Sequence, residues 1–143
     1  MNLLYKPELE STPKKEDLDR LRFEIDQNNI AVTGTSTGNK DIVLFIRNSK
    51  NNLIAGVQGD YNTSGWLYIC CIWVSEEYRS QGYGTLLIRC IESEAKKNGC
   101  TNSYLNTIEF QAPEFYKRLG YHVFASLENF HQNYTKYFLK KNL

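Results

Sequence analysis

The feature that most constrains this chain is a three-part stretch at its centre: an apolar run, a turn with two glycines, and an amphipathic segment. The run GWLYICCIWV, residues 65–74, is apolar almost throughout, which predicts a strand covered on both faces in the middle of a sheet. The turn RSQGYG, residues 79–84, and a helical pattern lead to a second predicted strand, TNSYLNT, residues 101–107. Such a strand–helix–strand unit is right-handed, and its two strands run parallel.

The helix of this unit has a one-sided apolar pattern, which predicts packing against the sheet. Gly99 is a credible C-terminal cap because glycine tolerates the left-handed conformation that ends many helices. The residues that we expect on the apolar face are Leu86, Leu87, Cys90, Ile91 and Ala95.

Four further strands are predicted from short runs rich in β-branched and aromatic residues. Residues 41–47 and 52–61 flank the polar NSKN and predict an antiparallel hairpin. Residues 121–127 and 134–140 alternate well enough to pair, with the loop ENFHQN between them. Residues 2–7 could add a short first strand.

Two more helices complete the predicted order. Thr12 and Pro13 give a start signal for the first helix, which we expect to end near Asn28 or Asn29; its apolar residues at helical spacing are Leu18, Leu21 and Ile25. Residues 112–120 predict a short helix with Pro113 in its first turn and Gly120 just past its end. The expected fold is a mixed α/β sheet of about six to seven strands with helices on both faces, in a single domain over residues 1–143.

Composition narrows the classes of function. The chain has 17 Lys and Arg against 16 Asp and Glu, so no global field attracts nucleic acid or anionic lipid. No apolar run approaches the roughly 20 residues that cross a bilayer, and the N-terminus lacks a signal-peptide pattern, so we expect a soluble, cytoplasmic protein without membrane partners. The four cysteines contain no C-x-x-C pair and the two histidines no H-x-x-x-H spacing, so neither a disulfide framework nor a metal site is predicted.

The glycine turn has two interpretations. It is an ordinary strand-to-helix turn, or Gly82 and Gly84 let the backbone approach an anion at the helix N-terminus, where unpaired N–H groups and a partial positive charge favour binding. Arg79 adds a permanent cation at the head of the turn. Two other phosphate-binding motifs do not match this turn. The motif G-x-x-x-x-G-K-[ST] needs a lysine where Thr85 stands, and the motif G-x-G-x-x-G needs its third glycine where Leu87 stands.

A resemblance to a known family favours the anion-binding interpretation of the glycine turn. Residues 73–99, WVSEEYRSQGYGTLLIRCIESEAKKNG, resemble the R/Q-x-x-G-x-G/A coenzyme A motif of the GCN5-related N-acetyltransferase (GNAT) family. The later stretch FYKRLGY is similar to a second family signature, F-Y-x-x-x-G-F/Y. With the element order, the resemblance covers essentially the full chain. It implies a GNAT-like fold and an N-acetyltransferase that uses acetyl-CoA.

The resemblance also implies which residues bind the coenzyme. The turn would wrap the pyrophosphate of acetyl-CoA, largely through main-chain N–H groups. The strand that ends in Trp73 and Val74 is similar to the family's central strand, which splays from its parallel neighbour and leaves backbone groups for the pantetheine arm and the thioester carbonyl. The coenzyme-binding residues implied are Trp73, Val74, Arg79, Ser80, Gln81, Gly82, Tyr83, Gly84, Thr85 and Asn106.

For the chemistry, the resemblance places Tyr116 in the general-acid position, where its phenol would protonate the departing thiolate. Many family members carry a carboxylate base on or near the central strand, whereas this strand offers Tyr68, Cys70 and Cys71. The base is therefore unassigned, with Asp60 and Glu109 as candidate proton acceptors.

The resemblance implies a primary amine as the acceptor, expected on a small molecule, with a protein or peptide amine as the alternative. A non-catalytic coenzyme-A-binding module is a further alternative, because the central strand lacks a carboxylate. Aromatic residues near the expected site either line an acceptor cleft or belong to the core; they are Tyr61, Trp66, Tyr68 and Phe110. The apolar YFL of the last strand leaves a homodimer open.

Overall fold

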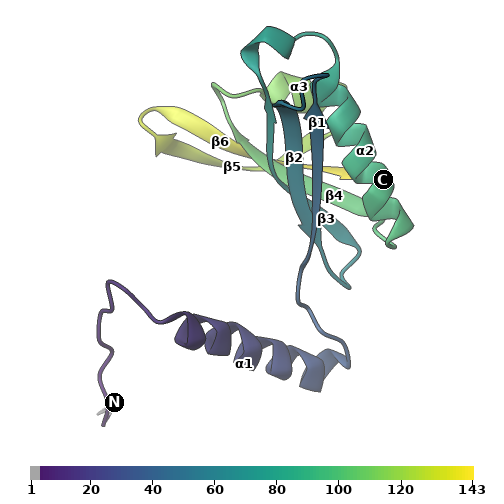
Figure 1. Ribbon diagram of the computed structural model, residues 1–143. Helices are drawn as coiled ribbons and strands as arrows, with labels where there is room; N and C mark the ends of the chain where they lie inside the picture. The colour runs from purple at the N-terminus through teal and green to yellow at the C-terminus, as the bar shows by residue number, and fades with distance from the viewer. Residues whose placement is uncertain (1–3) are drawn as a thin grey trace. The chain divides into compact units, whose positions relative to one another are not determined.

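The computed structural model describes residues 4–143, and the chain divides between residues 37 and 38 into two compact units. The N-terminal unit holds one helix, α1 (Lys15–Thr33), and the C-terminal unit holds the sheet and the other helices, as Figure 1 shows.

Helix α1 differs at both ends from the prediction. It begins at Lys15, two residues after Pro13, and it ends four to five residues later than expected, at Thr33. Gly34 stops it there, because its φ of 76° turns the chain out of the helix while its N–H donates to the Ile30 carbonyl. The strand predicted at residues 2–7 is wrong for residues 4–7, which form no strand, and residues 2 and 3 lie outside the described residues.

The C-terminal unit is built on one mixed six-stranded sheet, which confirms the predicted fold class. The strand order is β1-β2-β3-β4-β6-β5; all neighbouring pairs are antiparallel except β3 and β4, which are parallel as predicted. The strands are β1 (Lys40–Arg47), β2 (Leu53–Tyr61), β3 (Trp66–Val74), β4 (Asn102–Ile108), β5 (His122–His131) and β6 (Tyr134–Asn142). Most of the predicted loop at residues 128–133 is wrong, since β5 continues to His131.

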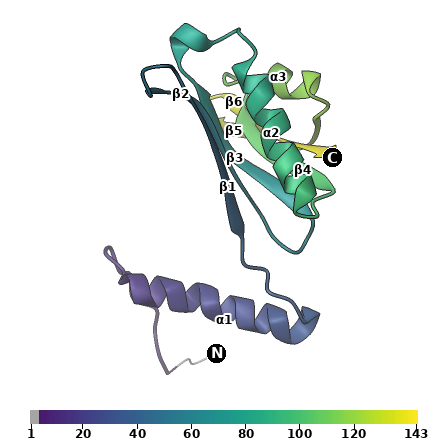
Figure 2. The ribbon, with the colours of Figure 1, turned by 45° about the vertical axis from the view of Figure 1, so that its right-hand side comes forward.

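Helix α2 (Tyr83–Lys97) packs on β1, β2 and β3 and closes the core on one face of the sheet, which Figure 2 shows most clearly. Its buried face is rotated from the predicted one: Leu86 and Cys90 are exposed, whereas Ile88 is buried with three of the predicted residues, Leu87, Ile91 and Ala95. The helix ends at Lys97, with Asn98 as its C-cap and Gly99 next, at a φ of 88°.

The buried face of α2 also carries a charge, Glu92. Its carboxylate accepts hydrogen bonds from Lys141 Nζ at 2.9 and 3.0 Å and from the Tyr121 hydroxyl at 2.8 Å. The Tyr121 hydroxyl lies 2.9 Å from Ser103 Oγ. A buried charge is tolerated only when it is paired and hydrogen-bonded, so this network explains a glutamate where the apolar pattern predicted none.

Candidate active site

The site lies where β3 and β4 separate. The two strands pair only from Trp66–Asn102 to Ile69–Leu105, and beyond that point β3 pairs with β2 while β4 pairs with β6. The prediction of a strand covered on both faces is therefore wrong: β3 is buried only at Leu67 and Ile69, which share one face, and Cys70 and Cys71 are exposed. The separation opens the interior of the sheet at its C-terminal end.

A β-bulge accompanies the separation. Cys71 faces Gln58 and Ile69 faces Gly59, so Cys70 is the extra residue on β3. Gly59 makes the bulge possible, because a Cβ at this position would lie 2.6 Å from the Tyr68 carbonyl oxygen. Bulges occur often beside functional sites, where they redirect a strand.

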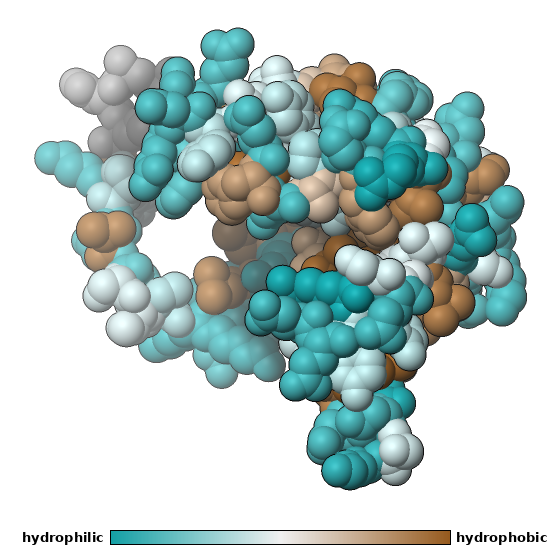
Figure 3. All heavy atoms as spheres, turned by 90° about the horizontal axis from the view of Figure 1, so that it is seen from above, coloured by the Kyte–Doolittle hydropathy of each residue, from teal (hydrophilic) through white to brown (hydrophobic). Residues whose placement is uncertain are grey.

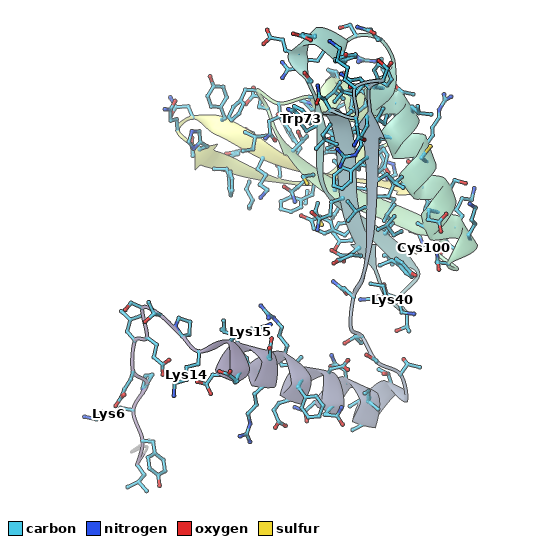
Figure 4. All side chains as sticks on the ribbon, viewed as in Figure 1. Lys6, Lys14, Lys15, Lys40, Trp73 and Cys100 are labelled. Carbon is cyan, nitrogen blue, oxygen red and sulfur yellow. The ribbon has the colours of Figure 1, made fainter. Side chains whose placement is uncertain are left out.

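The larger of two cavities at this end, the loop cavity, has a volume of about 580 Å³. It is enclosed by the end of β3, the segment that includes the short helix η1 (Glu76–Tyr78), the start of α2 and the helix α3 (Pro113–Arg118). Its lining residues are Ile72, Trp73, Val74, Tyr78, Arg79, Ser80, Gly82, Tyr83, Gly84, Thr85, Ala112, Phe115 and Arg118. In Figure 4, Trp73 marks this end of the sheet, and Cys100 and Lys40 mark the opposite one.

The loop before α2 has an unusual backbone that aims the helix N-terminus at the loop cavity. Ser80 and Gly82 have φ values of 60° and 90°, in the left-handed region. Gly82 is the N-cap and has no side chain to cover the first N–H groups of α2. Gly84 serves a different purpose: its Cβ would lie 3.2 Å from the Phe115 ring, so glycine lets α3 approach the helix start.

The two long side chains of the loop differ in their placement. Arg79 lines the loop cavity, and its Nε donates to the Val74 carbonyl at 3.1 Å, which ties the loop to the end of β3. Gln81 is not among the lining residues, because its side chain turns back to the Glu77 carbonyl at 2.9 Å. All other coenzyme-binding residues that the sequence predicted line one of the two cavities.

The second cavity, the strand cavity, has a volume of about 350 Å³ and lies between β3, β4 and α3. It shares Ile72, Ala112 and Phe115 with the loop cavity, so the two adjoin. Its other lining residues are Cys70, Cys71, Asn106, Thr107, Gln111 and Tyr116. Figure 3 views the molecule from this end and shows apolar surface among polar side chains.

Tyr116 is the buried titratable group of the strand cavity. It is 8% exposed, and its ring contacts Phe115 and Tyr121 edge to face. Burial, and next the neighbouring Cys71, raises the pKa of the Tyr116 phenol above its ordinary value. The phenol therefore keeps its proton at neutral pH and can donate it.

The two candidate proton acceptors lie at different places. Asp60 is next to the strand cavity, since its Oδ2 lies 3.4 Å from the Sγ of Cys70, which lines that cavity. Glu109 lies outside both linings, and its Oε2 accepts the Thr135 N–H at 3.1 Å. Of the two carboxylates, only Asp60 lies beside a cavity, and the proton acceptor stays unassigned.

The four aromatic residues named as candidates from the sequence also lie at different places relative to the strand cavity. Trp66 and Tyr68 contact Tyr104, and the Tyr68 hydroxyl accepts a hydrogen bond from Asn106 of the strand cavity at 2.9 Å. Tyr61 packs against the core. Phe110 instead contacts the rings of His131 and Tyr134.

Several cavity residues were missed by sequence reasoning. Tyr78, Phe115 and Arg118 line the loop cavity, and Arg118 is its second cation. Arg118 lies in the last turn of α3, where basic residues are common for reasons of helix electrostatics, so its position alone gave no signal. Phe115 belongs to the FYKRLGY motif, which was the available signal.

Among residues 4–143, no group of three or more His, Cys, Asp and Glu side chains is arranged to hold a metal ion. No helix in that part of the chain has both the length and the apolar character needed to cross a membrane.

Comparisons with known proteins agree with this architecture. The sequence model described as the acetyltransferase (GNAT) family matches residues 4–121. An acetyltransferase of Agrobacterium fabrum is 35% identical over 99 residues, 69% of this chain and 71% of that protein. Blasticidin-S acetyltransferase of Streptomyces morookaense is 38% identical over 79 residues, 54% of this chain and 58% of that protein.

Solved structures have the same fold. An acetyltransferase from Bacillus cereus superposes with a TM-score of 0.81 at 28% identity, over 95% of this chain and 98% of that one. A structure from Bacillus anthracis in complex with acetyl coenzyme A has a TM-score of 0.64 at 20% identity, over 72% of this chain and 62% of that one. The second likeness concerns the fold alone.

Proposed function

This chain belongs to the GNAT family of acetyltransferases and is an acyltransferase, and on that premise we propose that it moves an acetyl group from acetyl-CoA to a primary amine of a small molecule. The observation that carries the proposal is the pair of adjoining cavities at the separation of β3 and β4. One has the donors for an anionic coenzyme, and the other holds a protonated phenol.

The loop cavity fits acetyl-CoA by the chemistry of its lining. The N-terminus of α2 presents backbone N–H groups and a partial positive charge, and Arg79 and Arg118 add two permanent cations. We assign the pyrophosphate to residues 79–85, mainly through main-chain N–H groups. Gln81 contributes there through its backbone, since its side chain bonds to Glu77.

The end of β3 is assigned to the pantetheine arm and the thioester. Past Ile69 this strand has no β4 backbone beside it, so its outward N–H and C=O groups suit an extended ligand. A backbone N–H near Trp73 or Val74 would hold the thioester carbonyl and stabilise the oxyanion. Loss of one such donor costs about 3–4 kcal/mol of transition-state stabilisation in enzymes.

When bound, acetyl-CoA supplies an acetyl group already activated as a thioester. The neutral amine forms the new N–C bond, the C–S bond breaks, and the sulfur takes a proton from the Tyr116 phenol. The nitrogen loses one proton as the amide forms, and solvent returns a proton to the Tyr116 phenolate. Tyr116 suits the role of donor because its raised pKa keeps the phenol protonated at neutral pH, so a proton is available when the thiolate departs.

A small-molecule acceptor is favoured by one relative. A protein that is 38% identical over the matched part is named for the small molecule blasticidin S. Protein and peptide amines are carried as the alternative, and the acceptor panel below includes them.

The first experiment measures coenzyme binding by isothermal titration of acetyl-CoA into the full chain. Gly84→Val should raise Kd by about tenfold or more, because a side chain at this position meets Phe115 and pushes α3 from the helix start. Leu86→Val is the matched control, because it places the same side chain at an exposed residue of α2 that lines neither cavity. No heat of binding at high micromolar acetyl-CoA would refute the proposal.

The second experiment follows thiol release from acetyl-CoA with a panel of alkylamines, arylamines, amino acids, aminoglycosides and short peptides. Turnover with a small amine is the expected result. Turnover with peptides alone would select the alternative acceptor, and binding without turnover of any amine would contradict amine acetylation.

A further inference from the structure

One row of side chains crosses the whole sheet beside the strand cavity. In strand order from β1 to β5, successive register partners are Asp41, Asp60, Tyr68, Tyr104, Lys140 and His122. Register partners point to the same face, and this face is opposite to the one that α2 covers, because the neighbouring residues Leu67, Ile69 and Leu105 form the core. Two carboxylates, of Asp41 and Asp60, lie at one end of this row, and the basic residues Lys140 and His122 lie at the other. The two tyrosine rings lie between them.

The aromatic centre of the row is pre-arranged. The rings of Tyr68 and Tyr104 stack with centroids 4.8 Å apart and planes 27° apart, and Trp66 meets Tyr104 edge to face at 6.0 Å. Asn106 Nδ2 donates to the Tyr68 hydroxyl at 2.9 Å, and Asn106 lines the strand cavity. This hydrogen bond links the stacked tyrosine pair to the strand cavity, where we propose that acetyl transfer occurs.

Asp60 does not line the strand cavity but contacts Cys70, which does. Its Oδ2 accepts from Cys70 Sγ at 3.4 Å, and its Oδ1 accepts from Asn39 Nδ2 at 2.7 Å. Both donors are neutral, so neither cancels the carboxylate charge. Within residues 4–143, the ion pairs of the structure include neither Asp60 nor its register partner Asp41, although facing like charges across two strands are unfavourable.

The electrostatic potential around Asp60 is therefore negative. Partial desolvation of the thiol and then Asp60 raise the pKa of Cys70 to about 11, and desolvation and then the Asp60 charge raise the pKa of Tyr104. At neutral pH the Cys70 thiol stays protonated, so it does not compete with the amine as a nucleophile. At the other end of the row, Lys140 lies 5.5 Å from the centre of the Phe124 ring, which puts positive charge on the far side of the aromatic pair.

We propose that Asp60 and the stacked Tyr68 and Tyr104 form the recognition site for a cationic acceptor, an aliphatic amine that arrives as an ammonium ion. The inference rests on the proposed function and adds the substrate class. The Asp60 carboxylate attracts the cation. The faces of the aromatic rings bind its alkyl substituents and its positive charge. Lys140 repels the cation from the β6 side, which orients it toward Asp60 and the strand cavity. Asp60 acts here as a binding residue, and the bound ammonium loses a proton to solvent before the neutral amine attacks the thioester.

The first test uses a cation that cannot be acetylated on nitrogen. Choline and its uncharged isostere 3,3-dimethyl-1-butanol are titrated into the full chain and followed by NMR saturation transfer. Choline should bind about tenfold more tightly than the alcohol, and Asp60→Asn should remove most of that difference. Glu128→Gln, which removes an exposed carboxylate on β5, is the matched control and should change nothing. Equal binding of the two probes, or full choline affinity in Asp60→Asn, overturns the inference.

The second test uses acetyl transfer with two kinds of amine. For an alkylamine, a cation at neutral pH, Asp60→Asn should raise KM about tenfold with kcat little changed; for an arylamine, which is neutral there, KM should stay the same. The affinity for acetyl-CoA and the melting temperature of the variant establish that it is folded. Tyr104→Leu should raise KM for the alkylamine in the same direction.

The outcomes separate the two proposals. If the protein acetylates arylamines but not alkylamines, the inference is wrong and acetyl transfer stands. If it acetylates no amine but binds choline in an Asp60-dependent way, the proposed function is wrong and the cation site stands. A uniform KM increase for both amine classes in Asp60→Asn would indicate a structural role for Asp60 and overturn the inference.

Discussion

At the scale of single residues, Tyr116 has the sharpest assigned role. Tyr116→Phe keeps the ring that packs against Phe115 and Tyr121 and removes only the proton donor. We expect kcat to fall about 100-fold or more, as for the loss of a general acid, while Kd for acetyl-CoA changes less than about twofold. Steady-state kinetics and titration measure the two quantities. Tyr134→Phe on the exposed hairpin is the control.

The pH dependence of kcat tests the same role. An acid must be protonated to donate, and the raised pKa of Tyr116 extends its protonated range to higher pH than for an ordinary tyrosine. The alkaline fall of kcat should therefore lie above the ordinary tyrosine pKa of about 10 and should be missing from Tyr116→Phe. An unchanged alkaline limb in this variant would assign that limb to another group.

Glu92 is a buried charged residue whose substitution should lower the stability of the fold. Glu92→Gln leaves the Lys141 ammonium, whose side chain is 24% exposed, without its counter-charge. We expect the free energy of unfolding to fall by about 3 kcal/mol, measured by urea denaturation. Glu114→Gln breaks a pair whose side chains are 45% and 70% exposed, and should cost less than about 1 kcal/mol. Equal losses would contradict the structural role given to the buried network.

At the scale of elements, the bulge on β3 depends on Gly59 of β2. Gly59→Ala places a methyl group 2.6 Å from a backbone carbonyl, which cannot move without disturbing the ladder. The free energy of unfolding should fall by about 1–3 kcal/mol. Gly56→Ala on the same strand is the matched comparison, because its nearest contact is the exposed side chain of Phe45, which can rotate away. A larger loss at Gly56 would argue against the bulge as the constraint.

Hydrophobic periodicity predicted the strand pairing correctly but not the buried face of helix α2. The β1–β2 hairpin and the parallel pairing of β3 and β4 followed from apolar runs and turn residues. The buried face of α2 did not: Cys90 was expected inside and Glu92 outside, and the structure reverses both. Hydropathy cannot place a buried glutamate, because its burial depends on Tyr121 and Lys141, which are distant in the sequence.

At the scale of the whole molecule, coenzyme binding should stabilise the folded chain. At 100 times Kd, a ligand that binds only the native state adds about 2.7 kcal/mol, which corresponds to roughly 8 °C in Tm for a chain of this size. A thermal scan with acetyl-CoA checks this, with adenosine at the same concentration as the control. An equal shift with adenosine would place the binding energy outside the pyrophosphate and the pantetheine arm.

Some properties of the whole molecule stay predictions. A location in the cytoplasm and a homodimer through the last strands rest on the sequence alone. The single domain over residues 1–143 is likewise a prediction, and the structure divides the chain into two compact units.

The strand and helix order of the C-terminal unit and the family could be predicted from the amino-acid sequence, because apolar periodicity, turn residues and the motifs RSQGYG and FYKRLGY are local patterns. Which residues meet at the site depends instead on contacts between distant segments. The separation of β3 from β4, the contact of Asp60 with Cys70 and the stack of Tyr68 on Tyr104 join segments far apart in the chain. Their placement depends on strand register and on one bulge, and neither leaves a periodic signal in the sequence.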